Sequence, residues 1–345
     1  MRERNLYLDI VKGIAIISVI FGHSIQYGNG SEYLDYSYYF DNIVFQFFYS
    51  FHMPLFMLIS GYLFYYSVEE KSISEIIKVK CRSFLFPIFS FAIIAKYGVI
   101  MSFIIGRSGF EEFTNNFLKL VLLNYHLWFL WAVLLNSIIV LIVRKIKYSI
   151  AIYTLIWLLF LFIPSHRLPP VYSFVFPFFI IGYMANRHNV LSRIVVDKKL
   201  LLITGVIFIS LFHFYDRNSF VYTTGQCILR DNWINYLALD LYRFSIGLIG
   251  SIFILSSIYY CYQHFYMKMS RIFSFLSLMG LYSMGLYCFQ DLLFLYYRRY
   301  ALLHIEDLGI QSPVATFLLI YFLSFLLTHY SRKLKVTNIL LLGGR

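Results

Sequence analysis

Ten long apolar stretches dominate this sequence, and they exclude a fold that is surrounded by water on all sides. Of the 345 residues, 60% are hydrophobic and only 13% are charged, whereas a soluble domain has about 25% charged residues. A membrane span needs about 20 mostly apolar residues. The sequence therefore predicts an all-α, polytopic membrane protein of about ten transmembrane helices. The apolar stretches lie at 6–27, 43–66, 83–105, 119–143, 148–163, 171–186, 200–215, 235–262, 275–297 and 313–330.

The basic residues between these stretches predict the orientation of the chain. If the N-terminus is cytoplasmic, the segments on that side contain roughly three times as many Lys and Arg residues as the segments on the other side, which is the bias of cytoplasmic loops. We expect both termini in the cytoplasm, an uncleaved first helix and a single integral membrane domain over residues 1–345. The net charge of +12 then reflects topology and contact with anionic membrane lipids, and it does not indicate a nucleic-acid partner.

The first stretch contains three ionisable residues, Asp9, Lys12 and His23. Eleven residues of helix rise roughly 16 Å, and at about 100° per residue Lys12 and His23 fall on one face. Because ionisable groups within a span are rare and face the bundle interior, this stripe is a candidate site. A structural alternative is equally open: Lys12 can extend to the interface with Asp9 as its partner, and His23 can bond a neighbouring helix.

The second stretch contains His52 two residues before Pro54, a residue that kinks a helix. Phe56 and Ser60 follow at four-residue spacing on roughly the same face. Ser60 and Gly61 form a small pair that permits close approach of another helix. A kinked structural helix with a hydrogen-bonded histidine explains the same pattern.

Lys80 and Arg82 precede Pro87 at the predicted cytoplasmic entry to the third span. Such residues commonly serve only to set topology. They also predict a docking site for an anionic ligand, because cationic side chains bind phosphate groups.

Taken together, these segments resemble the membrane acyltransferase-3 family, which includes bacterial O-acetyltransferases of cell-surface polysaccharides. The resemblance runs from residue 4 to about 330. Two departures are Lys12, where Arg is commoner, and Gln290, where the family often has His. The matching pieces are Arg4 to Ala15 with Gly22-His23, Phe51-His52-Met53-Pro54-Leu55-Phe56, Ser60-Gly61-Tyr62, Arg82 to Pro87, Leu127-Trp128-Phe129-Leu130, Phe178 to Tyr183, and Ser283 to Tyr287.

The resemblance implies transfer of an acyl group, usually acetyl, from acyl-CoA to a hydroxyl of a sugar, a lipid-linked glycan or a surface polysaccharide in the bacterial plasma membrane. Acetyl-CoA is the expected donor, and no metal is expected. We expect His23 to act as base or acyl carrier, since histidine suits both roles. The remaining expected sites are catalytic Asp9 and His52, donor-binding Lys12, Lys80 and Arg82, and substrate-binding Trp128 and Ser60.

Two other classes of function fit a many-spanned chain. An exporter or flippase of a small acid or glycolipid also places charges inside a bundle, although no inverted repeat is visible in this sequence. A polysaccharide polymerase or ligase is the second alternative, and the loop at 216–233 is a modest version of the large outer loop that it needs. The four cysteines are scattered without a CxxC pair, so they predict neither a disulfide framework nor a metal site.

Overall fold

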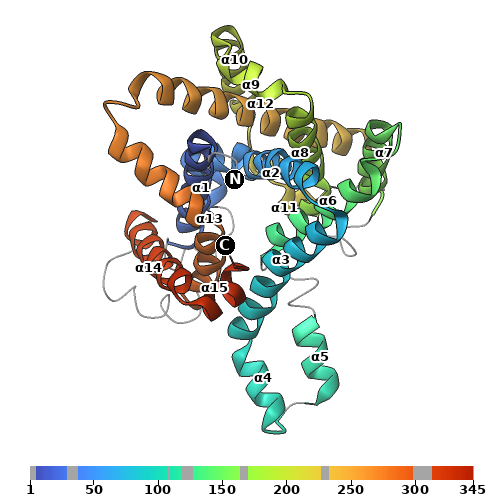
Figure 1. The fold of residues 1–345 in the computed structure, drawn as a ribbon, viewed down its shortest axis with the longest axis vertical. Coiled ribbons are helices and arrows are strands. Elements are labelled where there is room, and N and C mark those ends of the chain that lie inside the picture. The colour runs from blue at the N-terminus through green and yellow to red at the C-terminus, as the bar shows by residue number, and fades with distance from the viewer. Residues whose placement is uncertain are drawn as a thin grey trace.

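The computed structural model describes residues 5–28, 38–107, 109–118, 127–163, 170–226, 233–297 and 313–344. Within these residues every regular element is a helix, and no strand occurs among them (Figure 1). The predicted all-α class is therefore confirmed.

Five helices are long and apolar enough to cross a membrane. A sixth candidate is a bent pair, α3 (Ile73–Ala95) and α4 (Tyr97–Ile104), whose axes differ by 68° at Lys96. The sequence predicts an unbroken span at 83–105, but the charged Lys96 lies at the break, where it ends α3 and precedes α4. The five long helices are α1 (Leu6–Tyr27), α2 (Ile43–Glu70), α12 (Trp233–Phe265), α13 (Ser270–Tyr296) and α14 (Pro313–Lys333).

The other four predicted spans correspond to shorter helices. They contain 13 to 18 residues, and 18 residues of helix rise only about 27 Å, slightly less than the hydrocarbon core of a bilayer. Residues 119–126, predicted within the fourth span, lie outside the described residues. The count of ten spans and the cytoplasmic termini thus stay predictions. The four helices are α6 (Trp128–Val143), α7 (Ser149–Leu161), α8 (Pro170–Arg187) and α10 (Lys198–Phe212).

Short elements complete the described fold. They are η2 (Tyr38–Asp41), α5 (Phe110–Leu118), α9 (Val190–Val196), η4 (Arg217–Ser219), α11 (Val221–Thr224) and α15 (Lys335–Leu342).

Glycines allow close backbone contact in two helix pairs, α1 with α13 and α2 with α8. In the pair of α1 and α13, a Cβ at Gly280 would overlap the carbonyl oxygen of Asp9, and one at Gly13 would overlap that of Leu276. Gly61 of α2 and Gly182 of α8 make the same reciprocal contact. Small residues permit such approach in membranes, so the backbones of α1 and α13 lie in direct contact.

Polar side chains cap the N-terminal ends of α1, α2 and α3. Asn5 caps α1 by accepting from the Leu8 N–H at 3.2 Å, and Asn42 caps α2 by accepting from Val44 and Phe45. Ser72 and Glu75 form a capping box at the start of α3. These caps fix where α1, α2 and α3 begin.

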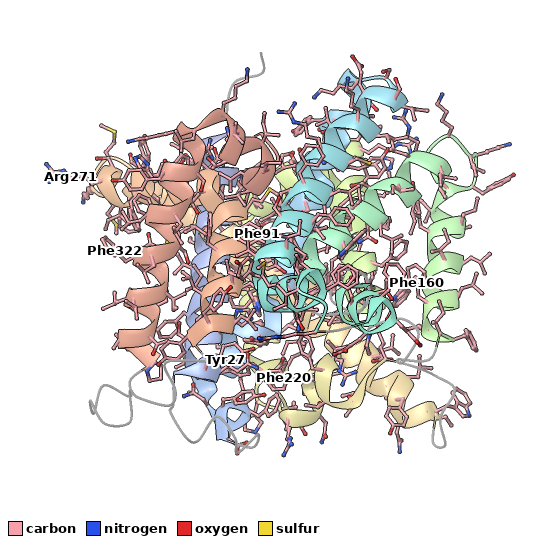
Figure 2. All side chains as sticks on the ribbon, turned by 90° about the horizontal axis from the view of Figure 1, so that it is seen from below. Tyr27, Phe91, Phe160, Phe220, Arg271 and Phe322 are labelled. Atoms are coloured by element: carbon pink, nitrogen blue, oxygen red, sulfur yellow. The ribbon has the colours of Figure 1, made fainter. Side chains whose placement is uncertain are left out.

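The bundle has two ends, which we call the Lys12 end and the His23 end after the two residues of α1. At the Lys12 end, Arg144 donates to the Val68 carbonyl at 3.0 Å and Asn186 donates to the Tyr62 carbonyl at 2.6 Å. Figure 2 places Arg271 near one end of the bundle, with Tyr27 and Phe220 near the other. The two hydrogen bonds thus join α2 to the C-terminal ends of α6 and α8 at the Lys12 end.

Candidate active site

A cavity of about 540 Å³ opens between α1, α2 and α13 at the His23 end. We call it the His23 cavity. Two imidazoles, one carboxylate and many aromatic rings line it. Its lining residues are Val19, His23, Gln26, Tyr27, Tyr39, Phe40, Phe45, Tyr49, His52, Met53, Trp128, Phe220, Tyr222, Tyr287, Asp291 and Phe294.

A second cavity of about 460 Å³ lies at the Lys12 end. We call it the Lys12 cavity. Its lining is mostly apolar and contains three cationic side chains, Lys12, Lys80 and Arg332. Ser60, Ser67, Ser283 and Thr328 supply hydroxyl groups to the same lining.

The two cavities share one wall. Val19, Met53 and Tyr287 line both of them. Val19 lies between Lys12 and His23 on α1, seven residues after one and four before the other, so all three lie on nearly the same helix face. Lys12 and His23 both face the bundle interior, and a thin partition separates the cavities that they line.

The His23 ring is oriented by α13. Its Nδ1 lies 2.9 Å from Oε1 of Gln290, and the amide Nε2 of Gln290 donates to the Tyr287 carbonyl at 3.2 Å. Since a carbonyl only accepts, the amide oxygen must face His23, and Nδ1 must carry the proton. The lone pair of the neutral ring is therefore on Nε2.

His52 has the same tautomer. It is almost fully buried, and its Nδ1 donates to the Phe48 carbonyl at 2.6 Å. The ring of Tyr49 lies close to both imidazoles, with centroid distances of 6.5 Å to His23 and 4.6 Å to His52. The two histidines thus line one cavity on either side of a tyrosine.

Lys12 forms an ion pair with Asp9, with 2.6 Å between Nζ and Oδ1. Asp9 is buried and does not line either cavity. Its carboxylate therefore orients Lys12 without facing a bound ligand.

The side chains of Lys80 and Arg82 point to different sides of α3, the helix that contains both residues. Lys80 lies over the ring of Phe64, 4.8 Å from its centroid, and lines the Lys12 cavity. Arg82 is exposed and lines neither cavity, because two residues correspond to about 200° around a helix. Of the two residues, only Lys80 faces the Lys12 cavity, and binding of an anionic ligand by both residues stays a prediction.

Arg332, and not Arg82, is the arginine that lines the Lys12 cavity together with Lys12 and Lys80. It donates to the Leu281 carbonyl at 3.0 Å and lies over the ring of Tyr282, 5.0 Å from its centroid. In the sequence, Arg332 is one of the basic residues that follow the last span, a place typical of residues that only set topology. Its contact with α13 depends on helix packing that the sequence does not state.

The two expected substrate-binding residues lie in different cavities. Trp128 lines the His23 cavity and Ser60 lines the Lys12 cavity. Next to Trp128, the Phe129 N–H donates to the Tyr287 hydroxyl at 3.4 Å. The sequence assigns no role to Tyr287, Gln290 or Asp291, which occupy neighbouring turns of α13 at the His23 cavity.

The arrangement suits transfer of a group between two ligands. Cations in an apolar cavity favour a ligand with phosphate groups and a slender apolar portion. An imidazole with its lone pair on Nε2 can take a proton from a hydroxyl group in the other cavity. Among the described residues no cluster of three or more His, Cys, Asp or Glu is arranged to hold a metal ion, and the expectation of no metal stays a prediction.

Comparison with known proteins agrees with this geometry. A family model described as "Acyltransferase domain" matches residues 5–330, so the chain belongs to the acyltransferase-3 family, a family of membrane proteins. No solved structure matches the chain significantly.

Two curated relatives carry the name "Nodulation protein NolL". The one from Mesorhizobium japonicum is 30% identical over 192 residues, which are 53% of this chain and 48% of the relative. The one from Sinorhizobium fredii is 35% identical over 143 residues, 40% of this chain and 36% of the relative. The matched part thus spans about half the length of these relatives or less.

Proposed function

We propose that this protein is a membrane O-acyltransferase that moves an acyl group, acetyl in the simplest case, from acyl-CoA to a hydroxyl of a cell-surface sugar or polysaccharide. The proposal places residues 1–345 as one domain in a bacterial plasma membrane. The observation that carries it is the pair of cavities with one shared wall, cationic on the Lys12 side and lined by imidazoles on the His23 side.

The Lys12 cavity is the proposed donor site. Acyl-CoA is polyanionic at its nucleotide and has a slender pantetheine arm that ends in the thioester. Lys12, Lys80 and Arg332 supply charge for the phosphates, and the apolar lining suits the arm. The thioester then reaches the wall at Val19, Met53 and Tyr287, and only the acyl group has to cross it.

His23 is the proposed general base. The acceptor hydroxyl attacks the thioester carbonyl, a C–O bond forms, and Nε2 of His23 takes the hydroxyl proton. The C–S bond then breaks, and the CoA thiolate receives that proton as it leaves. Gln290 keeps the proton on Nδ1 throughout, so that Nε2 stays the basic atom.

Tyr287 is the proposed donor to the carbonyl oxygen. Its hydroxyl accepts from the Phe129 N–H, which leaves the hydroxyl proton to be donated to a third group. A donor aimed at the oxyanion stabilises the tetrahedral intermediate of acyl transfer. Its place in the shared wall matches where the thioester and the acceptor meet.

The His23 cavity is the proposed acceptor site. Aromatic rings such as those of Trp128 and Tyr222 offer broad apolar contact to the flat faces of a sugar ring. Asp291 lines the same cavity, and its carboxylate can accept hydrogen bonds from sugar hydroxyls. His52 contributes a second imidazole for binding the acceptor or relaying its proton.

The test uses the purified chain in lipid nanodiscs with radiolabelled acetyl-CoA and a series of octyl glycosides as acceptors. We expect acetylated glycoside, identified by mass spectrometry. His23→Ala should abolish transfer, and His213→Ala, which removes an exposed histidine in the turn after α10, should leave it unchanged.

Two results would contradict the proposal. Full transfer by His23→Ala would remove the mechanism. Uptake of an unmodified solute into proteoliposomes, with no acylated product from any donor, would instead support an exporter or flippase.

A further inference from the structure

Arg243 of α12 is a guanidinium buried inside the protein, with 2% of its surface exposed. It forms an ion pair with Asp240 one turn earlier, 2.9 Å between Nη1 and Oδ1. Both side chains are buried, and taking such charges out of water is unfavourable unless hydrogen bonds replace those to water. The other partners of Arg243 therefore explain why it is there.

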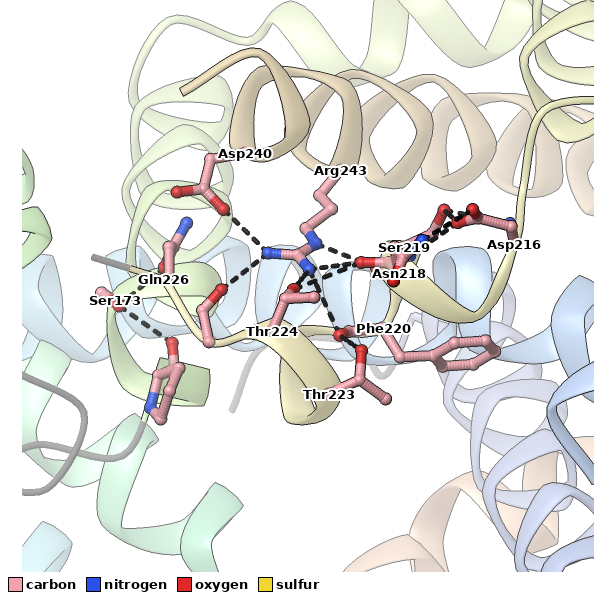
Figure 3. Close-up of polar contacts among 12 residues, drawn as sticks. Ser173, Asp216, Asn218, Ser219, Phe220, Thr223, Thr224, Gln226, Asp240 and Arg243 are labelled. Atoms are coloured by element: carbon pink, nitrogen blue, oxygen red, sulfur yellow. Dashed lines mark hydrogen bonds and ion pairs between the residues drawn. The ribbon is translucent and has the colours of Figure 1, made fainter. Parts of the chain in front are cut away.

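Those partners come from one short segment, residues 218–225 (Figure 3). Arg243 donates to five of its acceptors, which cover η4, α11 and the link between them. They are the carbonyl oxygens of Asn218 at 2.5 Å, Ser219 at 3.0 Å, Phe220 at 3.3 Å and Gly225 at 2.8 Å, and the hydroxyl of Thr224.

The segment is also held at its ends. Asp216 accepts from the Ser219 N–H at 3.0 Å, and Gln226 accepts from the Ser173 hydroxyl of α8 at 2.6 Å. Gly225 has a φ of +74°, a conformation that favours glycine. One cation thus holds together a segment that consists of two short helical turns, η4 and α11.

The same segment supplies one wall of the His23 cavity. Phe220 stacks on Phe45, 5.4 Å between centroids, and lies 5.8 Å from Tyr49, the tyrosine between the two imidazoles. Tyr222 lines the cavity beside it. Arg243 itself does not line the cavity, so it acts on the cavity only through the segment.

We propose that Arg243 is a positioning residue for the acceptor: it holds Phe220 and Tyr222 where the sugar ring binds, and it has no part in binding the donor. This inference rests on the proposed function. It assigns residues 218–225 to recognition of the acceptor and the cations of the Lys12 cavity to binding of the donor. Changes in the first set must therefore alter the KM for the acceptor, and changes in the second set must alter the KM for the donor.

The experiment compares variants at saturating acetyl-CoA with the best octyl glycoside as the varied substrate, and then with the roles exchanged. Arg243→Lys keeps the charge but loses the fork of donors. We expect the KM for the glycoside to rise about tenfold or more, with the KM for acetyl-CoA within about twofold of the parent.

Milder variants cover the case in which Arg243→Lys does not fold. Thr224→Val removes one acceptor of Arg243 and keeps the side-chain shape, and Phe220→Ala removes a wall of the cavity. Both should raise the KM for the glycoside selectively. Combining Phe220→Ala with Thr224→Val should give less than the product of the two effects, because both act on one segment.

Arg332→Gln provides the matched control, since it removes a cation of the Lys12 cavity. We expect the opposite pattern there, a raised KM for acetyl-CoA and an unchanged KM for the glycoside. If Phe220→Ala and Thr224→Val change both constants equally or neither, the inference is wrong. If the parent chain acetylates no glycoside, the proposed function fails first.

Discussion

Nδ1 of His23 lies 2.9 Å from Oε1 of Gln290, so a residue of α13 determines which ring nitrogen of His23, on α1, is basic. The bond joins residues 267 positions apart in the chain. Gln290, which departs from the histidine often found at this position in the family, is thus the hydrogen-bond partner of His23.

Replacing Gln290 tests this bond. Gln290→Leu removes the acceptor for Nδ1–H, so the ring can rotate or change tautomer, and we expect kcat to fall about 10- to 100-fold. Gln290→Glu keeps an acceptor at the same place and should retain most of the activity. Steady-state kinetics with acetyl-CoA and the best glycoside gives both values. Parental kcat in Gln290→Leu would show that the bond has no catalytic effect.

The cations of the Lys12 cavity should determine donor affinity. Lys80→Gln and Arg332→Gln each remove a charge from the cavity lining, and we expect each to raise the KM for acetyl-CoA about tenfold, or about 1.4 kcal/mol. Arg82→Gln removes the same charge from an exposed position and should change it by less than about twofold. If Arg82→Gln raised the KM for acetyl-CoA as much as the other two variants, Arg82 would also have to contact the donor.

The shared wall should be the route of the acyl group. Val19→Phe adds bulk where both cavities meet, and we expect transfer to fall at least about 100-fold because the thioester and the hydroxyl no longer reach each other. Binding of acetyl-CoA, measured by equilibrium dialysis in nanodiscs, should persist. Val206→Phe, on an exposed face of α10, is the matched control. Undiminished transfer by Val19→Phe would exclude this route.

Close contact between α1 and α13 should limit stability. Gly280→Val places a side chain against the carbonyl of Asp9, and we expect a loss of at least about 1–3 kcal/mol. A lower Tm in the same detergent measures it. Gly98→Val, where nothing lies within 4 Å of the added Cβ, should leave the Tm nearly unchanged. A Tm for Gly280→Val that matches the parent would contradict the close contact of the two helices.

The local pattern of α1 could be predicted because helix periodicity alone puts Lys12 and His23 on one face. The salt bridge of Lys12 with Asp9 followed from the same geometry, since the two residues are one turn apart. Lys80 and Arg82 point in different directions for a related reason: residues two apart in sequence do not share a face of a helix, and Lys80 alone of the two lines the Lys12 cavity.

Contacts between distant helices could not be predicted from one sequence. Gln290 and Arg332 matter because α13 and α14 pack beside α1, and no local signal states which helices are neighbours. The three-residue spacing of Asp240 and Arg243 on one helix is compatible with their ion pair, but the carbonyl partners of Arg243 at 218–225 depend on the path of a distant segment. The break at Lys96 likewise depends on packing that apolar content does not show.

The parallel pairing of α1 and α13 also has a consequence for biogenesis. A ribosome adds roughly 5–20 residues per second, so at least about ten seconds separate the emergence of His23 from that of Gln290. During that interval the first helix lies in the bilayer without the neighbour against which Gly13 and Asp9 pack. Nascent chains arrested before α13 therefore lack Gln290, the residue that orients the ring of His23.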